Sequence, residues 1–357
     1  MDLSDGWGDA RLAPFQALGR AYQRGLRLKG AQLMASRDPM GLPRLRESLA
    51  VHLEAQRAAR LDPSQILILR STAMAVTLVA HTLLGRQGDI VAVETPGHPE
   101  VWESLKQASH ADLRGLPVDS DGLVMDTLET LLQTERLKLL VLTPQCQFPT
   151  GVRLSASRRA RLLELSRRHR FPILELDAEH DYLPATESLA ALDTGQVLHV
   201  GSLSRIFAPG LRVSYLAAPA SLAPLLARAR QRIDWQGDPV QEWALSELFL
   251  DGEIQRQILR ARKAAGERRD AMQTALEDEM QGRLAWRPGA MAFWIEGLKD
   301  LSHPETFHAW IKGCQSQGLK LRPGRYYQLD GSNVAATRLG FTGHTPDELQ
   351  KAAAMMR

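Results

Sequence analysis

The 357-residue sequence contains only two cysteines, Cys146 and Cys314, and no Cys-x-x-Cys pair. This excludes a disulfide framework and a cysteine-based zinc site, and it is typical of a reducing compartment. No run approaches the ~20 apolar residues that a membrane helix needs. The first residues, MDLSDGWGDARLAP, lack the basic flank and apolar stretch of a secretory signal. We therefore expect a cytoplasmic protein that contacts no membrane and holds no metal.

Lysine is also scarce, because the chain has 8 lysines and 36 arginines against 41 acidic residues. The formal net charge is only +3. The densest basic stretch, RRARLLELSRRHR (158–170), interleaves its charges with leucines at helical spacing. We interpret it as the solvated face of a helix rather than as a nucleic-acid site. Small molecules, and not nucleic acid, are the partners that we expect.

Short apolar runs alternate with amphipathic segments of helical length up to residue 219. The runs are 65–69, 90–94, 137–143, 171–177, 197–202 and 213–219, and the helical patterns include 73–84 and 156–169. This alternation predicts a mostly parallel sheet covered on both faces. Ligands of such sheets bind at the carboxyl ends of the strands. The loops expected to converge on one cleft follow Leu69, Glu94, Thr143, Asp177 and Ser202.

The pattern changes after Pro219. We predict a long helical stretch at about 221–279, a turn and an alternating strand in 284–298, a helix at about 304–317 and two strands within 319–343. The closing TPDELQKAAAMMR predicts a helix capped by Thr345. We divide the chain into an N-terminal segment (1–37), a large α/β domain (38–240) and a smaller α+β domain (241–357).

Five stretches, in order, resemble the fold-type I pyridoxal phosphate (PLP) enzymes, and most of all the aminotransferase-like domain of MocR regulators of the GntR type. They are DPMGLPRLRESLAVHLEAQRA (38–58), GDIVAVETPGHPEVWESL (88–105), LTPQCQFPTGVRLSASRRARLLELS (142–166), VGSLSRIFAPGLRVSYLAAP (200–219) and TRLGF (337–341). The resemblance implies the aminotransferase fold, PLP as cofactor, an amino-acid-like substrate and a homodimer. The winged-helix domain of those regulators is not seen, so DNA binding is not expected.

The resemblance also assigns the ends of a binding site. It places the cofactor phosphate among Ser71, Thr72, Ala73, Ser202 and Ser204, with Arg212 as the guanidinium. Hydroxyls, N–H groups at a helix start and a bidentate guanidinium are suited to phosphate. Arg338 in TRLGF corresponds to the arginine that binds the substrate α-carboxylate, for which a planar fork is well shaped. His98 replaces a stacking tyrosine, and Ser36 replaces a tyrosine that reaches the partner's phosphate.

The reactive centre departs from the family pattern at Arg205. PLP chemistry needs an amine that forms a Schiff base and then moves protons. Arginine cannot replace it, because its guanidinium stays protonated and is a poor nucleophile. We therefore predict that the chain forms no internal aldimine, and that PLP is lost or held non-covalently.

The acid beside the pyridine nitrogen is the second departure. The ungapped comparison of the family's IIEDDYDSEF with ILELDAEHDY (173–182) puts Leu176 in place of the acid and Ala178 in place of a tyrosine. A one-residue slip would give these roles to Asp177 and His180. Such a slip turns side chains to the other face of a strand, so we favour the ungapped version.

Three functions follow from this combination. The first is an aminotransferase-like enzyme that uses PLP. The second is a non-catalytic homologue that binds a carboxylated or phosphorylated molecule, or that completes the site of an intact paralogue in a heterodimer. The third is a PLP-independent enzyme in which Arg205, Arg212 and Arg338 clamp anions while His98, His180 or Asp177 acts as acid or base.

Overall fold

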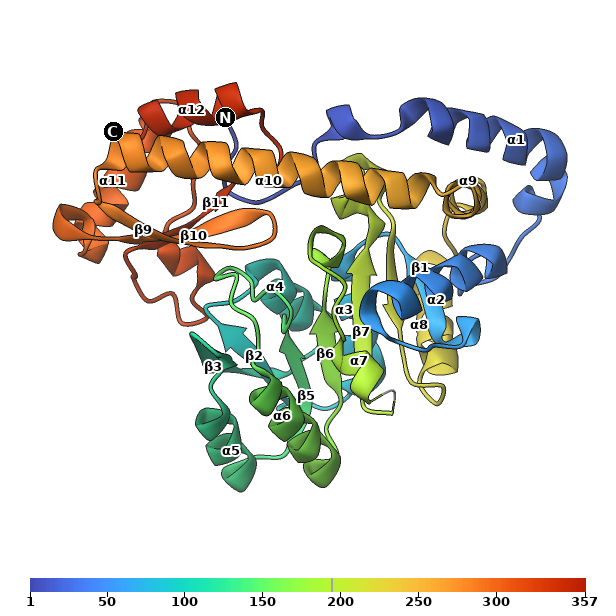
Figure 1. Ribbon diagram of the computed structural model, residues 1–357. Coiled ribbons are helices and arrows are strands. Elements are labelled where there is room, and N and C mark those ends of the chain that lie inside the picture. Colours follow the sequence, from blue (N-terminus) through green and yellow to red (C-terminus); the bar gives the residue numbers. More distant parts are fainter. Residues whose placement is uncertain (194) are drawn as a thin grey trace.

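The computed structural model describes residues 1–193 and 195–357, and it shows two units side by side (Figure 1). Within these residues, eight strands form the sheet of the larger unit and three strands form a second sheet. The long helix α10 (Glu253–Met280) runs from one unit to the other. The observed class is therefore the predicted one, a mostly parallel α/β unit with a smaller α+β unit.

The larger sheet has the strand order β1-β8-β7-β6-β5-β2-β3-β4. Its parallel centre consists of β7 (Val197–Ser202), β6 (Ile173–Leu176), β5 (Leu137–Leu142), β2 (Ile90–Thr95) and β3 (Asp112–Asp119). The strand β8 (Ser214–Ala217) is antiparallel to β7 and to β1 (Ile66–Leu69), and β4 (Gly122–Leu123) is antiparallel to β3. All six strands predicted before residue 219 are present. The sequence missed β3, because Gly115 and Pro117 interrupt its pattern.

Helices cover both faces of this sheet. The helices α3 (Thr72–Leu83), α4 (Pro99–Ala108) and α8 (Ala223–Asp234) share an apolar core with one face. The helices α5 (Met125–Thr134), α6 (Ala156–His169) and α7 (Leu189–Leu192) cover part of the other. Continuous apolar strands are the expected result of burial on both faces.

The predicted helical stretch at 221–279 is not continuous. It divides into α8, α9 (Pro239–Leu250) and α10. Asp238 caps α9 and Pro239 occupies its first position, where a missing N–H is harmless. Gly252, at a φ of 70°, separates α9 from α10. The helices α1 (Phe15–Met34) and α2 (Pro43–Arg57) pack against α9.

The smaller unit contains β9 (Leu284–Pro288), β10 (Ala292–Gly297) and β11 (Ala336–Gly340), with the helices α11 (Pro304–Ser316) and α12 (Pro346–Ala354). The stretch 284–298 is thus a hairpin of two strands rather than a turn and one strand. Only one strand lies within 319–343, because residues 324–327 form a 3-10 turn instead. The predicted cap is confirmed, since the Thr345 hydroxyl accepts from the Glu348 N–H.

The opening segment, residues 1–9, is built into the smaller unit. The Leu3 N–H donates to the Lys320 carbonyl at 3.1 Å, and the Gly340 N–H donates to the Leu3 carbonyl at 2.8 Å. The Thr342 hydroxyl donates to the Trp7 carbonyl at 2.9 Å. These contacts fix the segment where the two units meet.

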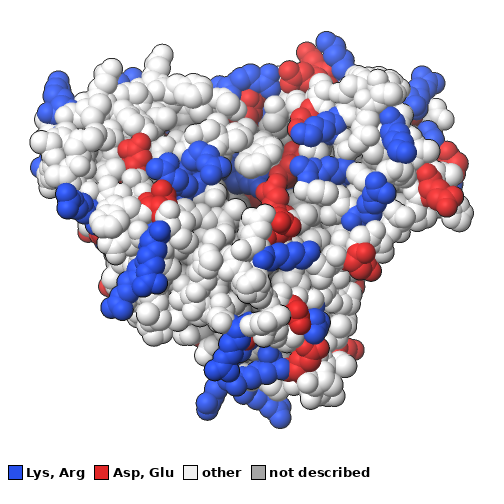
Figure 2. Space-filling model, turned by 180° about the vertical axis from the view of Figure 1, so that it is seen from behind, with Lys and Arg blue, Asp and Glu red and all other residues white. Residues whose placement is uncertain are grey.

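Charges of both signs are mixed over the rear face (Figure 2). On α6, Arg158 pairs with Asp119 at 2.6 Å and Arg161 pairs with Glu129 at 2.7 Å. These two side chains are partly exposed, which agrees with the predicted solvated face, whereas Arg159 of the same stretch is buried. Among the helices of the described residues, none has the length and apolar character to span a membrane.

Candidate ligand-binding site

A cavity of about 280 Å³ lies at the carboxyl ends of the parallel strands of the larger sheet. Its lining comes from the loops that follow β1, β2, β5, β6 and β7, together with Trp7 of the opening segment and Arg212. The prediction that these strand ends converge on one cleft is therefore confirmed.

The anion-binding end of the cavity lies at the start of α3. Ser71 caps this helix, and its hydroxyl accepts from the Met74 N–H at 3.1 Å. The N–H groups of Thr72 and Ala73 have no acceptor within the first turn and carry the positive end of the helix dipole. Arg212 lines the same cavity at a left-handed φ of 56°. Its exposed guanidinium has no carboxylate partner among the described residues. A phosphate would find both donors and a positive charge here.

The two predicted phosphate-binding serines also brace the loop that carries Arg212. The Ser204 hydroxyl accepts from the Val213 N–H at 2.9 Å and lies 3.2 Å from the Val213 carbonyl. The Ser202 hydroxyl accepts from the Ser214 hydroxyl at 3.1 Å. Both serines line the cavity and both are buried. These two serines therefore line the cavity and also fix the backbone next to Arg212.

His98 forms part of the cavity wall together with Phe148. The two rings stack with centroids 4.2 Å apart and an interplanar angle of 24°. Burial lowers the pKa of His98 to about 4, Arg205 and Arg338 add to this effect, and Asp5 opposes it. The imidazole is therefore neutral near pH 7, which suits a flat stacking surface.

Leu176 and Asp177 both line the cavity, but their environments differ. Leu176 packs in the apolar core with Val200, and it also lies beside His98 in a narrow pocket. The Asp177 carboxylate accepts from Arg57 Nε at 2.8 Å, and this pair is almost fully buried. Leu176 thus presents an apolar side chain beside His98, while the Asp177 carboxylate is engaged by Arg57.

Arg205 follows β7 in a one-turn 3-10 helix, at the position predicted for the reactive amine. Its Nη1 donates to the Gly6 carbonyl at 2.6 Å and lies 3.5 Å from Asp5 Oδ2. Its guanidinium carbon stands 4.1 Å from the centroid of the Trp7 ring. Three successive residues of the opening segment thus hold this side chain by hydrogen bonding, charge and cation–π attraction.

Arg338, predicted to bind a substrate carboxylate, lies behind the cavity wall. It is 1% exposed, and its guanidinium stands 4.4 Å from the Phe148 ring centroid. Its Nη2 donates to Glu179 Oε1 at 2.6 Å, and its Nε lies 3.3 Å from Asp5 Oδ1. Burial acts to lower the pKa of Arg338, but Glu179 and Asp5 outweigh it and raise this pKa. Two carboxylates of the chain therefore already surround the guanidinium.

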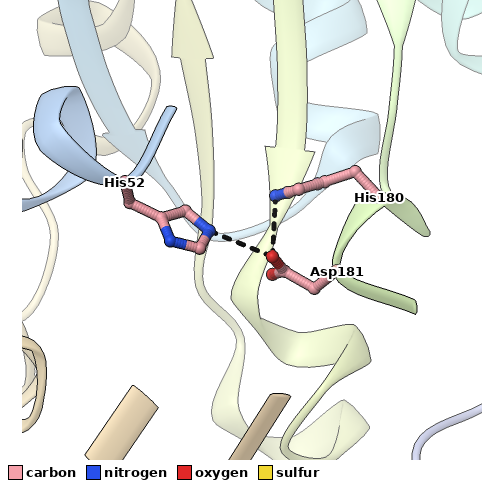
Figure 3. A group of neighbouring side chains, drawn as sticks. All are labelled: His52, His180 and Asp181. Carbon is pink, nitrogen blue, oxygen red and sulfur yellow. Dashed lines mark hydrogen bonds and ion pairs between the residues drawn. The ribbon is translucent and has the colours of Figure 1, made fainter. Parts of the chain in front are cut away.

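His180, predicted as a possible acid or base, is not among the residues that line the cavity and is fully buried in a cluster with His52 and Asp181 (Figure 3). Asp181 Oδ1 lies 3.0 Å from His52 Nε2 and 3.2 Å from His180 Nε2. His180 Nδ1 lies 2.7 Å from the Asp177 carbonyl. Burial acts to raise the pKa of Asp181, but the two histidines lower it well below its ordinary value. Although one atom from each side chain could ligate a metal, all three are engaged in this network.

Sequence reasoning missed the opening segment and Glu179 as parts of the site. The available signal was DGWG (5–8), in which glycines flank a tryptophan. A Cβ at Gly8 would collide with the Arg205 carbonyl, and one at Gly6 would collide with Met291. Gly8 therefore lets the backbone approach residue 205 closely, but the DGWG motif alone does not identify the residue that it contacts.

Comparison with known proteins agrees with this architecture. The aminotransferase class I and II family matches residues 3–356. An uncharacterized HTH-type transcriptional regulator of Bacillus subtilis, YisV, is 28% identical over 96% of this chain and 70% of that protein. A probable rhizopine catabolism regulatory protein of Rhizobium meliloti, MocR, is 28% identical over 74% of this chain. This chain spans only 53% of MocR.

Solved structures show the same fold. The α-aminoadipate aminotransferase LysN of Thermus thermophilus, complexed with N-(5′-phosphopyridoxyl)-L-leucine, superposes with a TM-score of 0.89 at 24% identity. The match covers 99% of this chain and 90% of that one. From the family match along almost its whole length, this chain belongs to the aminotransferase class I and II family.

Proposed function

We propose that this protein binds a phosphorylated small molecule non-covalently in the cavity and forms no aldimine with PLP. The observation that carries the proposal is the environment of Arg205, whose guanidinium is held by Asp5, Gly6 and Trp7. A group fixed in this way and permanently charged cannot act as the amine of a Schiff base.

The described residues that line the cavity offer no second amine. Among the described lining residues there is no lysine. Lys138, one of the two lysines nearest to position 205 in the sequence, lies at the amino end of β5, whereas the cavity lies at the carboxyl ends of the strands. Lys263, the other, is on α10 with its side chain 81% exposed.

The residues fit part of the cofactor that the family relationship suggests. The start of α3 and Arg212 suit its phosphate, and His98 supplies a neutral flat surface for its ring. When bound through a lysine, PLP supplies an electron sink for reactions at an amino-acid α-carbon. Leu176 offers no acid to the ring nitrogen and Arg205 offers no amine. The site therefore fits a phosphorylated aromatic ligand but not the covalent chemistry, and we derive no reaction through the cofactor.

A PLP-independent enzyme is less well supported. Arg205 and Arg338 are already paired with carboxylates, Asp177 is engaged by Arg57, and His180 is buried in its own network. Arg212 is the one predicted clamp without such a partner in the described part of the chain.

A second copy of the chain is the expected partner. The helix α1 exposes Phe15, Leu28 and Met34 by 60% or more each. These side chains point in different directions around α1, so the predicted homodimer rests on the family resemblance, with a heterodimer as the alternative. Sedimentation of the purified chain checks this expectation.

The test of the proposed function uses two ligands. Added PLP should retain the absorbance spectrum of free PLP. After borohydride reduction, the intact mass of the protein should show no stoichiometric adduct. Pyridoxine 5′-phosphate, which has no aldehyde, should bind in calorimetry. Arg212→Ala should weaken it about ten- to a hundredfold, because a charged hydrogen bond contributes about 1.5–3 kcal/mol.

The matched control is Arg232→Ala, which removes an exposed arginine of α8 outside the cavity. It should leave the affinity unchanged. A stoichiometric lysine adduct, or an Arg212→Ala variant that binds as well as the wild type, would overturn the proposed function.

A further inference from the structure

The opening segment places a carboxylate between the two arginines at the inner end of the site. Asp5 Oδ1 lies 3.3 Å from Arg338 Nε, and Asp5 Oδ2 lies 3.5 Å from Arg205 Nη1. Each oxygen of one carboxylate thus faces a different guanidinium. A ligand carboxylate directed at Arg338 would need to occupy this same place.

Asp5 is held there by a fixed backbone. Leu3 is fully buried, and its carbonyl accepts from the Gly340 N–H at 2.8 Å. The Tyr327 hydroxyl lies 3.4 Å from the Ser4 carbonyl. The Gly6 N–H donates to Asp5 Oδ1 at 2.8 Å and so orients the carboxylate itself. Asp5 therefore lies in a fixed position against Arg205 and Arg338 and is not the tip of a loose terminus.

The four charged groups that meet at the inner end of the site balance one another. Arg205 and Arg338 contribute two positive charges, and Asp5 and Glu179 contribute two negative ones. Burial acts to raise the pKa of Asp5, but the two guanidinium groups outweigh it and lower this pKa, so the carboxylate is ionised. At the other end of the cavity, Arg212 has no carboxylate partner among the described residues.

We propose that Asp5 is a built-in carboxylate ligand of Arg205 and Arg338, so that the cavity selects monophosphates that carry no carboxylate of their own. A ligand carboxylate at the inner end would meet Asp5 and Glu179 with both arginines already neutralised. A phosphate at the outer end meets the start of α3 and Arg212. This inference rests on the proposed function, because it assigns a ligand class to the same cavity.

The experiment compares two probes that differ by one carboxylate. N-(5′-phosphopyridoxyl)-L-leucine carries it, and N-(5′-phosphopyridoxyl)-3-methylbutylamine lacks it. Calorimetry on the intact wild-type chain should show that the leucine compound binds no more tightly than the amine compound. In Asp5→Asn the affinity for the leucine compound should rise about tenfold relative to the affinity for the amine compound, because a charge-assisted hydrogen bond to a freed guanidinium becomes available.

Asp2→Asn is the matched control, because Asp2 lies in the same segment and pairs with Lys320 on the surface at 2.7 Å. It should leave the affinity ratio unchanged. Glu179→Gln is the second variant, since it frees Arg338 from the other side without altering the opening segment. It should also favour the leucine compound, and melting curves show whether each variant is folded.

The outcomes separate this inference from the proposed function. If the wild type prefers the leucine compound by tenfold, or if neither folded variant gains a preference for it, the inference is wrong while phosphate binding stands. If the wild type binds neither of the two probes nor pyridoxine 5′-phosphate, both the proposed function and the ligand class inferred from it are wrong.

Discussion

Asp177→Asn should destabilise the protein without weakening the binding of a phosphorylated ligand. Its carboxylate forms a pair with Arg57 at 2.8 Å, and the two side chains are 3% and 0% exposed. Removing one member of a buried pair costs about 3–5 kcal/mol, because the other charge is left without a partner. An unfolding entropy of about 2.1 cal/mol/K per residue gives about 0.75 kcal/mol/K for this chain of 357 residues. The melting temperature should therefore fall by about 5 °C.

Scanning calorimetry measures this shift, and titration with pyridoxine 5′-phosphate measures the affinity. The double variant Arg57→Met, Asp177→Leu should recover most of the lost stability, because a buried pair can be replaced by apolar side chains of similar size. A melting temperature within about 1 °C of the wild type, together with a loss of affinity, would refute the reasoning. Asp177 would then face the ligand, and the one-residue slip of the sequence comparison would be correct.

Three further variants test the site. Arg205→Lys alone should give no robust transamination in a coupled assay, because Leu176 still offers no acid, and rapid turnover would contradict that assignment. Burial raises the pKa of Glu94 to about 7 from 4.5, and hydrogen bonds from Thr143 only reduce this effect. The folded state therefore keeps a proton that the unfolded state releases, so wild-type stability falls as pH rises from 4.5 to 7. Urea unfolding at the two pH values measures the difference in unfolding free energy between Glu94→Gln and the wild type. This difference should shift by about 3 kcal/mol in favour of the variant from pH 4 to pH 7. Burial lowers the pKa of His98 from 6.5 to about 4, so wild-type stability falls as pH drops through this range, and His98→Phe should remove that fall. A pH-independent difference from the wild type would contradict either pKa argument.

The sheet could be predicted because its signal is local. Each central strand is a short apolar run buried on both faces, and the ends of such strands meet at one edge. The missed strand β3 shows the limit of that signal, because Arg114, Gly115 and Pro117 give it a loop-like composition. The break between α8 and α9 is different, because Gly237, Asp238 and Pro239 are ordinary signals for the end of one helix and the start of the next, and the prediction of one helical stretch overlooked them.

The state of the arginines could not be predicted because their partners are distant in the sequence. Arg338 meets Asp5 across 333 positions and meets Glu179 across 159. A motif identifies Arg338 as able to bind a carboxylate, but it does not say which carboxylate is nearby. The same holds for Asp177, whose partner Arg57 comes from α2.

The contact between Asp5 and position 205 also bears on how a PLP-dependent reaction could be built into this site. A lysine introduced at 205 would stand beside the ionised Asp5, which favours the ammonium form, and only the neutral amine attacks an aldehyde. Restoring the reaction therefore needs Asp5 to change as well, and an acid to replace Leu176. Under the proposed function, a single substitution at 205 therefore leaves the site without transamination activity, because the packing of the opening segment keeps an acidic group against the introduced amine.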